Sequence, residues 1–206
     1  MNWTSHHIDT LTEIISMAME RAAGFLNEIL RTHIELRVTR VYILENQREL
    51  EKLWQRQSNP PELAAVGLRF HHDASGGAAL LLPPESAVKL VTLVTGETDE
   101  SPYLAMDDLH IDALTEIGNI VLNNLLGMIG SQLQASLRVS FPRYQEGLAG
   151  QILAFHAGKE PMARLFANVV FNIQSHHIEG YLLMTLETAL LNKLLNDNGK
   201  TEEPAL

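Results

Sequence analysis

One eight-residue segment occurs twice in this chain. HIDTLTEI at residues 7–14 returns as HIDALTEI at residues 110–117, with Thr10 against Ala113 as the one difference. The copies lie 103 residues apart in a chain of 206, so the offset is half the chain. Four further identical pairs share this offset: Gly24 and Gly127, Leu30 and Leu133, Arg40 and Arg143, Gly77 and Gly180. Because a repeat marks copies of one folding unit, we expect a single domain, residues 1–206, made of repeats of about 1–103 and 104–206.

The composition is that of a globular protein. Hydrophobic residues make up 46% of the chain and charged residues 19%, which is enough apolar material for a packed core and unlike a disordered chain. There is no cysteine, which excludes thiol nucleophiles, disulfides and cysteine-ligated metals.

The charge pattern argues against a polyanionic partner. The formal net charge is −10, both halves carry an excess of acidic residues, and no run of Lys or Arg occurs. Nucleic acid is therefore excluded, because phosphate backbones need a basic stripe. The N-terminal residues are polar and no apolar run is long enough to span a membrane, so we expect a cytoplasmic protein.

Each half contains strands between two helices. Helical spacing of apolar residues predicts long helices at 8–31 and 110–135, and acidic residues (Asp9, Asp107, Asp108, Asp112) suit their N-termini. Shorter helices are expected at 87–95 and 189–195. Alternating or β-rich runs predict the strands 34–42, 64–70, 78–82, 137–141, 151–155, 163–173 and 180–185. The sequence thus predicts an α+β fold with antiparallel pairing and pseudo-twofold symmetry.

Three segments fall outside the strands and helices of this scheme. Residues 45–63, with a helical stretch at 49–54, have no evident partner in the second half and are interpreted as a peripheral insertion. Residues 97–102 are expected to link the repeats, and residues 157–161 to form a turn.

The second long helix carries one polar stripe. Asp112, Glu116, Asn119 and Asn123 are spaced by four, three and four residues, so their side chains share one helix face. On spacing alone, this is the wet side of an amphipathic helix. Gly118 and the mid-helix asparagines are poor helix formers, however, and Gly118 indicates close approach by another backbone or side chain.

The segment Glu116-Ile117-Gly118-Asn119-Ile120, preceded by Asp112-Ala113-Leu114, resembles the Glu-x-x-Asn signature of the CheC/CheX/FliY chemotaxis phosphatases. The length, the repeat and the order helix, strands, helix also resemble a CheC-like protein. The resemblance implies a phosphatase that hydrolyses the aspartyl phosphate of a CheY-like receiver domain. Asn119 would position the attacking water and Glu116 would pair with a receiver lysine. The resemblance implies no cofactor of the chain's own, with Mg²⁺ carried by the partner receiver.

The first repeat carries a weaker copy of the motif. Glu13 matches, but Ser16 stands in the place of Asn119 and Glu20 in the place of Asn123. A serine cannot supply both an amide donor and a carbonyl acceptor from the same reach. We therefore expect one functional site, at Glu116 and Asn119, and a degenerate second site at Glu13 and Ser16.

Whether the chain is an enzyme stays open at this stage. The alternative is a non-catalytic CheC-like module that docks on a receiver domain or another chemotaxis protein. A third hypothesis, a ligand-binding or dimeric structural protein, depends on an apolar surface formed by Val121, Leu122, Leu125 and Leu126. Binding of a CheD-like deamidase and formation of a homodimer are also left open.

The histidines suggest a metal site only at first sight. Six of the nine histidines occur as adjacent pairs. Adjacent residues point to different sides of a helix or strand, so each pair offers one ligand to a shared ion. We expect solvated histidines in loops or at strand ends, and no metal site: His6 and His7, His71 and His72 before Asp73, His176 and His177.

Overall fold

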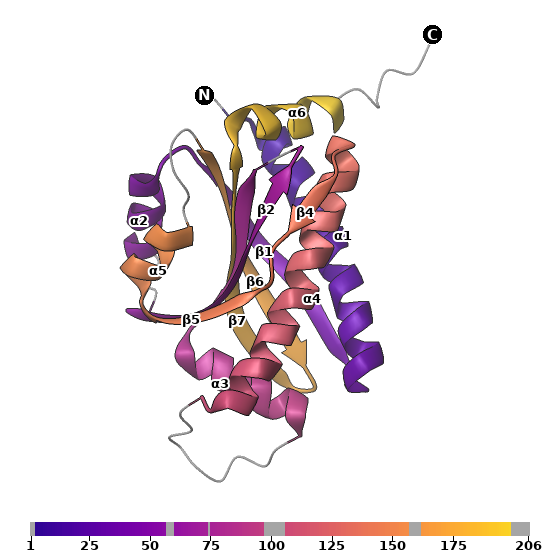
Figure 1. Ribbon diagram of the computed structural model, residues 1–206, viewed down its shortest axis with the longest axis vertical. Helices are drawn as coiled ribbons and strands as arrows, with labels where there is room; N and C mark the ends of the chain where they lie inside the picture. Colours follow the sequence, from indigo (N-terminus) through magenta and orange to yellow (C-terminus); the bar gives the residue numbers. More distant parts are fainter. Residues whose placement is uncertain (1–2, 57–59, 74, 97–105, 157–161, 199–206) are drawn as a thin grey trace.

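The computed structural model describes residues 3–56, 60–73, 75–96, 106–156 and 162–198. One antiparallel sheet runs through the molecule, with helices on both of its faces (Figure 1). No helix within these ranges is long and apolar enough to cross a membrane.

Six helices and seven strands are formed by the described residues. The helices are α1 (Ser5–Leu30), α2 (Gln47–Arg56), α3 (Pro84–Thr95), α4 (Asp108–Leu133), α5 (Ala149–His156) and α6 (Thr188–Asn198). The strands are β1 (Ile34–Leu44), β2 (Glu62–His72), β3 (Gly76–Leu82), β4 (Leu137–Val139), β5 (Arg143–Leu148), β6 (Met162–Ile173) and β7 (His176–Glu187).

The sheet order shows the pseudo-twofold symmetry directly. The strands follow one another as β1-β6-β7-β3-β2-β4, and β5 also pairs with β2. The central pair, β3 and β7, joins the equivalent strands of the two halves. Outward from it, β2 is equivalent to β6, and β4 with β5 is equivalent to β1. Each half therefore adds its first strand to the other half's edge: β1 pairs with β6, and β5 with β2.

The offset of 103 residues relates the two sets of elements almost residue for residue. Helix α1 at Ser5–Leu30 maps onto α4 at Asp108–Leu133 without any shift. Helix α2 maps onto α5, β2 and β3 onto β6 and β7, and α3 onto α6, each within a few residues. The predicted α+β fold with antiparallel pairing is thus confirmed, and so is the internal repeat.

Two predictions about the middle of each half are wrong. Residues 151–155 are not a strand, because they lie within helix α5. Residues 45–63 are not an insertion without a partner, because helix α2 within them is the equivalent of α5 and packs against it. The apolar run of α5 is too short for its periodicity to separate a helix from a strand.

Other predicted boundaries differ less from those of the structure. Of the expected strand 137–141, only Leu137–Val139 is a strand, and β5 follows it at Arg143–Leu148, which the sequence analysis did not predict. The expected linker 97–102 and the expected turn 157–161 lie outside the described residues.

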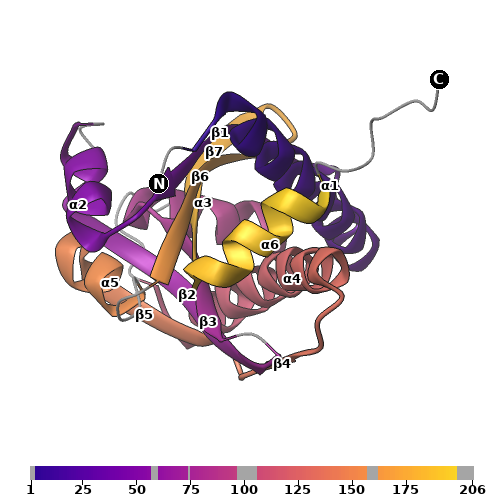
Figure 2. The ribbon, with the colours of Figure 1, turned by 90° about the horizontal axis from the view of Figure 1, so that it is seen from above.

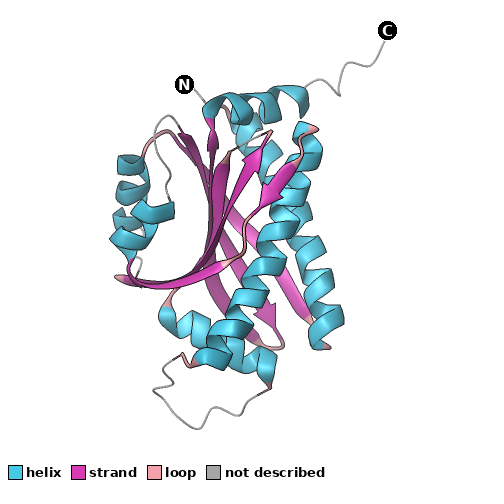
Figure 3. Cartoon of the chain, in the orientation of Figure 1, coloured by secondary structure: helices cyan, strands magenta, loops and turns pink. Residues whose placement is uncertain are grey.

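Helices cover both faces of the sheet (Figures 2 and 3), and an apolar layer lies on each face. The larger layer lies between the sheet and helices α1, α3, α4 and α6, with Leu11, Val66 and Leu122 among its fully buried members. The smaller layer lies under α2 and α5, where Trp54, Phe166 and Tyr181 form a cluster of aromatic rings. Helices α1 and α4 run side by side in opposite directions over the larger layer.

Candidate functional site

The repeated histidine contacts the N-cap residue of the long helix in each half. At α4, the Asp107 carboxylate accepts a hydrogen bond from the backbone N–H of His110 at 2.8 Å and contacts the buried His110 ring. The backbone bond is the main reason why the pKa of Asp107 is lowered. At α1, Thr4 and His7 bond to each other's backbone N–H groups as a capping box. Thr4 is therefore the N-cap of the first helix, and the expected Asp9 lies inside the helix.

Helix α4 lies close to the sheet at Gly118. A Cβ atom at this position would lie 2.6 Å from Cβ of Val66 on β2, which is closer than carbon atoms can approach. The close approach inferred from the mid-helix glycine is thus confirmed, and β2 is the element concerned. Ile117, Leu114 and Val121 are buried on the same side of α4. This contact fixes which face of the helix is turned away from the core.

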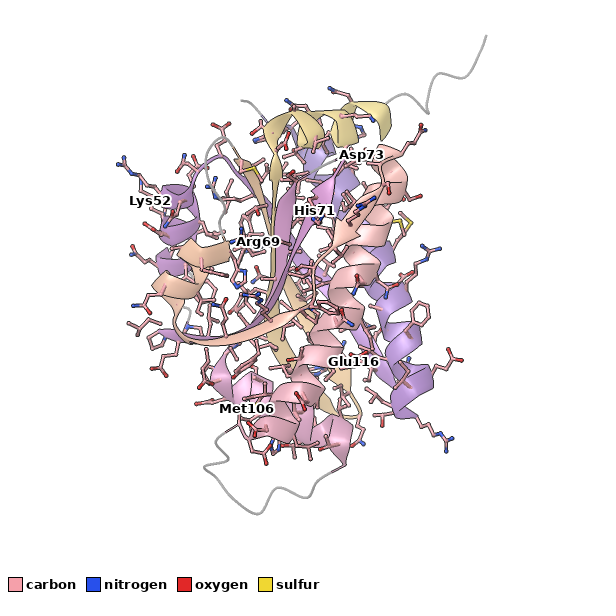
Figure 4. The ribbon with its side chains drawn as sticks, viewed as in Figure 1. Lys52, Arg69, His71, Asp73, Met106 and Glu116 are labelled. Carbon is pink, nitrogen blue, oxygen red and sulfur yellow. The ribbon has the colours of Figure 1, made fainter. Side chains whose placement is uncertain are left out.

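The polar stripe is on the outer face of α4. Asp112, Glu116 and Asn123 are exposed, and Asn119 between them is partly exposed. Figure 4 shows Glu116 on the flank of the molecule where α4 runs beside α1. A partner that packs on this flank can therefore reach both Glu116 and Asn119, which lie one helical turn apart.

The amide of Asn119 is held by a neighbour on the next turn. Asn123 donates its Nδ2 to the Asn119 backbone oxygen at 2.8 Å and to the Asn119 Oδ1 at 2.6 Å. Because Oδ1 of Asn119 already accepts this hydrogen bond, the amide Nδ2 group of Asn119 is the one left to donate to a bound molecule. We call this pair of asparagines the Asn119–Asn123 clamp. The spacing of the sequence places Asn123 in the polar stripe but does not predict its hydrogen bonds to Asn119.

The equivalent face of α1 lacks the clamp. Glu13 and Glu20 are exposed and Ser16 is partly exposed, so the positions themselves correspond to those of α4. Glu20 occupies the position of Asn123 but has no amide hydrogen to donate, and Ser16 has no amide at all. The two halves thus present equivalent helix faces with different chemistry.

The histidines form no metal site within the described ranges, where no group of three His, Cys, Asp or Glu could hold an ion. His71 and His176 lie at strand ends, as expected, whereas His6 and His7 belong to the first turn of α1.

The surface on which the third functional hypothesis depends is buried in the structure. This hypothesis needs an apolar surface for a ligand or a second subunit, formed by Val121, Leu122, Leu125 and Leu126. All four are at most 2% exposed and belong to the larger apolar layer. They therefore stabilise the fold and are not available to a partner.

Comparisons with known proteins point in one direction, although no protein-family model and no curated protein sequence matches the chain. The structure is similar to that of Thermotoga maritima FliY, with a TM-score of 0.75 and 17% identity, over 98% of this chain and 100% of that chain. It is also similar to the FliM middle domain from H. pylori, with a TM-score of 0.65 and 11% identity, over 95% and 99% of the two chains.

A third similar structure is the CheX-CheY-BeF3-Mg²⁺ complex from Borrelia burgdorferi. The match has a TM-score of 0.52 and 15% identity, and covers 87% of this chain and 99% of that chain. These identities establish a shared fold and no more. The resemblance seen in the sequence is confirmed at that level: the chain has the CheC-like α+β fold of FliY, CheX and the FliM middle domain.

Proposed function

We propose that this protein is a CheC-like chemotaxis regulator that docks on a phosphorylated CheY-like receiver domain and hydrolyses its aspartyl phosphate. The observation that supports this most is the Asn119–Asn123 clamp beside Glu116, on an exposed face of a long helix. The fold supports it as well, because FliY and CheX have it and one similar structure contains CheX together with CheY.

The proposed chemistry needs no nucleophile from this chain. An acyl phosphate is already activated, so a water molecule that is held in line with the phosphorus atom can attack it directly. In the proposal, Asn119 enters the receiver's active site, and its side-chain amide Nδ2 orients that water. The clamp keeps the amide in one orientation before the partner arrives, so that less freedom is lost on docking.

Glu116 has a separate role in the proposal. Its carboxylate lies one turn before Asn119 and is exposed, so it can pair with a lysine at the rim of the receiver's active site. Mg²⁺ enters with the receiver, whose own carboxylates hold it. This chain contributes the position of the water and the docking of the two proteins.

A non-catalytic binding module is the second candidate. It is favoured by the first repeat, where Ser16 and Glu20 replace the asparagines, and by the similarity to FliM middle domains. Two of the FliM structures are complexes, with FliG and with SpeE. In this case the same helix faces would bind a partner without turnover.

The decay of a phosphorylated CheY-like receiver, with and without this protein, tests the proposal. We expect faster decay with the wild-type chain, and a loss of about 100-fold or more in that acceleration for Asn119→Ala. Ser16→Ala is the matched control on the equivalent face of α1 and should leave the acceleration unchanged. Binding of the receiver with unchanged decay would select the non-catalytic module. An Asn119→Ala variant with wild-type activity would exclude the proposed role of Asn119.

A further inference from the structure

The outer edge of β4 is open in the structure. Strand β4 lies at one margin of the sheet (Figure 2), and within the described ranges it pairs with β2 alone. Ser136 bonds through its backbone to Asp73, directly after β2, and Ser140 bonds through its backbone to β2 itself. Because alternate residues of an edge strand turn their peptide groups to opposite sides, those of Leu137 and Val139 point away from β2.

The first half of the chain shows what can occupy such an edge. The offset of 103 residues relates Leu137 to Ile34 at the start of β1, and Gly130 on α4 to Asn27 on α1. The Asn27 side chain donates its Nδ2 to the Ile34 backbone oxygen at 3.0 Å, and its Oδ1 accepts a hydrogen bond from the Ile34 N–H. A residue of a neighbouring antiparallel strand would form the same two bonds. Gly130 has no side chain, so α4 offers no such amide to Leu137.

A groove lies along the same edge, between α4 and β4. It has a volume of about 240 Å³, and its lining includes Gly127 and Gly130 on α4 and Leu137 and Val139 on β4. A Cβ atom at Gly127 would have no neighbour within 4 Å, so the space beside the helix is open. Directly opposed residues of two antiparallel strands share one face of the sheet. A strand that pairs with Leu137 would therefore point every second side chain into this groove.

The other face of this edge is positively charged. Arg138 turns its side chain to the face opposite the groove, the register of β2 puts Arg69 on that face as well, and both are exposed. Neither forms an ion pair with a carboxylate of the described residues. Their equivalents in the first half are Glu35 and Asn172, which bond to each other at 3.2 Å, and Glu35 also pairs with Arg37 at 2.8 Å. The first half is thus paired within itself, whereas the second half leaves positive charge for an acidic partner.

We propose that the open edge of β4 binds an extended acidic segment of a partner protein, which adds a strand to the sheet. The side chains of this segment alternate. Small or apolar ones enter the groove, and the backbone groups of these residues bond to Leu137 and Val139. Acidic ones lie on the opposite face, beside Arg138 and Arg69. The proposal does not depend on turnover at Asn119.

An NMR titration of the whole chain with the peptide TEVEVET, blocked at both ends, tests the proposal. The amide resonances of Leu137 and Val139 should shift saturably, and the same peptide with Lys in place of Glu should bind at least 10-fold more weakly. N-methylation of both valines should weaken binding at least 10-fold, because the groove-facing residues lose the N–H groups that bond to β4. N-methylation of the first two glutamates is the matched control. Binding should then change less than 3-fold, because those N–H groups point away from β4.

Two variants that copy the first half test the same edge from the protein side. Gly130→Asn should weaken binding of the peptide at least 5-fold, because the new amide would occupy the peptide group of Leu137. Arg138→Glu should weaken it at least 10-fold, and Arg40→Glu on β1, with the same change of net charge, should leave it within 2-fold. If Gly130→Asn does not fold, as judged by thermal melting, the two methylated peptides still decide the matter.

Four results would overturn the proposal. The first is the absence of saturable shifts at Leu137 and Val139, and the second is equal weakening by the two methylations. The third is an equal effect of the Arg40 and Arg138 variants. The fourth is a shift of the Leu137 and Val139 resonances with protein concentration alone, which would identify a second copy of this chain as the occupant of the edge.

Discussion

The substitution Asn123→Asp tests the clamp without changing the shape of the side chain. Asp has the size of Asn but no amide hydrogen, so the 2.6 Å bond to Asn119 Oδ1 cannot form. Two acceptor oxygens would then face each other, and the Asn119 amide should rotate and turn its Oδ1 outward. The variant would thus present an acceptor where the wild-type chain presents a donor.

The size of the effect follows from the bond that is lost. A hydrogen bond of this kind contributes about 1 kcal/mol net, or about 5-fold in the population of the productive orientation. The repulsion between the two oxygens adds to this, so we expect the acceleration of receiver dephosphorylation to fall about 5- to 30-fold. Asn123 is exposed, so the free energy of unfolding should change by no more than about 0.5 kcal/mol.

Asn124→Asp is the matched control. It makes the same change of charge one residue further on, but the Asn124 side chain bonds to the Ile120 backbone oxygen and not to Asn119. We expect its activity to stay within 2-fold of the wild type. Side-chain amide resonances of Asn119 provide a readout that does not depend on activity, and they should shift in the Asn123 variant alone. Equal activity of the two Asp variants, or unchanged Asn119 resonances in Asn123→Asp, would refute the clamp.

Three further predictions concern the same helices. Gly118→Ala should lower the free energy of unfolding by about 1–3 kcal/mol, as measured by denaturant unfolding, because the new Cβ would meet Val66 on β2. Gly127→Ala is the control on the same helix: its Cβ would lie in open space, and the free energy of unfolding should rise by up to about 1 kcal/mol. Asp107→Ala should lower the free energy of unfolding at neutral pH. Because folding lowers the pKa of Asp107, the difference in unfolding free energy from the wild type should shrink as the pH falls from 5 to 2. Thr4→Ala removes an uncharged N-cap, so its difference in unfolding free energy should stay constant over that range. Ser16→Asn combined with Glu20→Asn should build a second clamp on α1 and raise receiver dephosphorylation by up to about 2-fold, while Glu20→Asn alone should not.

Much of the fold could be predicted from the sequence because its long elements have strong periodicity. The helices at 8–31 and 110–135 were placed within three residues of their observed ends, and the repeated octapeptide set them in register. The offset of 103 residues relates the helical stretch 49–54 to residues 152–157 and so indicates the helix α5, which the short apolar run alone does not.

The candidate site could be predicted only in part. The spacing of Glu116 and Asn119 places both on one helix face, but exposure depends on where the sheet lies, and Gly118 was the one indication of that. The grouping of Arg69, Arg143 and His156 between β2, β5 and α5 could not be predicted from the sequence. Arg69, Arg143 and His156 are far apart in the sequence, and only the register of β2 with β5 and the packing of α5 bring them together. Such long-range contacts leave no local pattern.

The two halves of the chain differ most where the fold constrains them least. Buried positions such as Leu11 and Leu114, or Ile14 and Ile117, are apolar in both halves, since each supports the same layer and a change in volume is costly. The partly exposed Asn119 and the exposed Asn123 have Ser16 and Glu20 as their counterparts, and such positions contribute little to the stability. Between β2 and α5 the difference needs two coupled changes, because the His156 ring can lie where it does only with a glycine at position 67. The offset of 103 residues gives Val170 and Leu53 at these two positions in the other half. It follows that Gly67→Val should be tolerated together with His156→Leu and destabilising alone. A Gly67→Val variant as stable as the double variant would show that the His156 ring does not lie against β2.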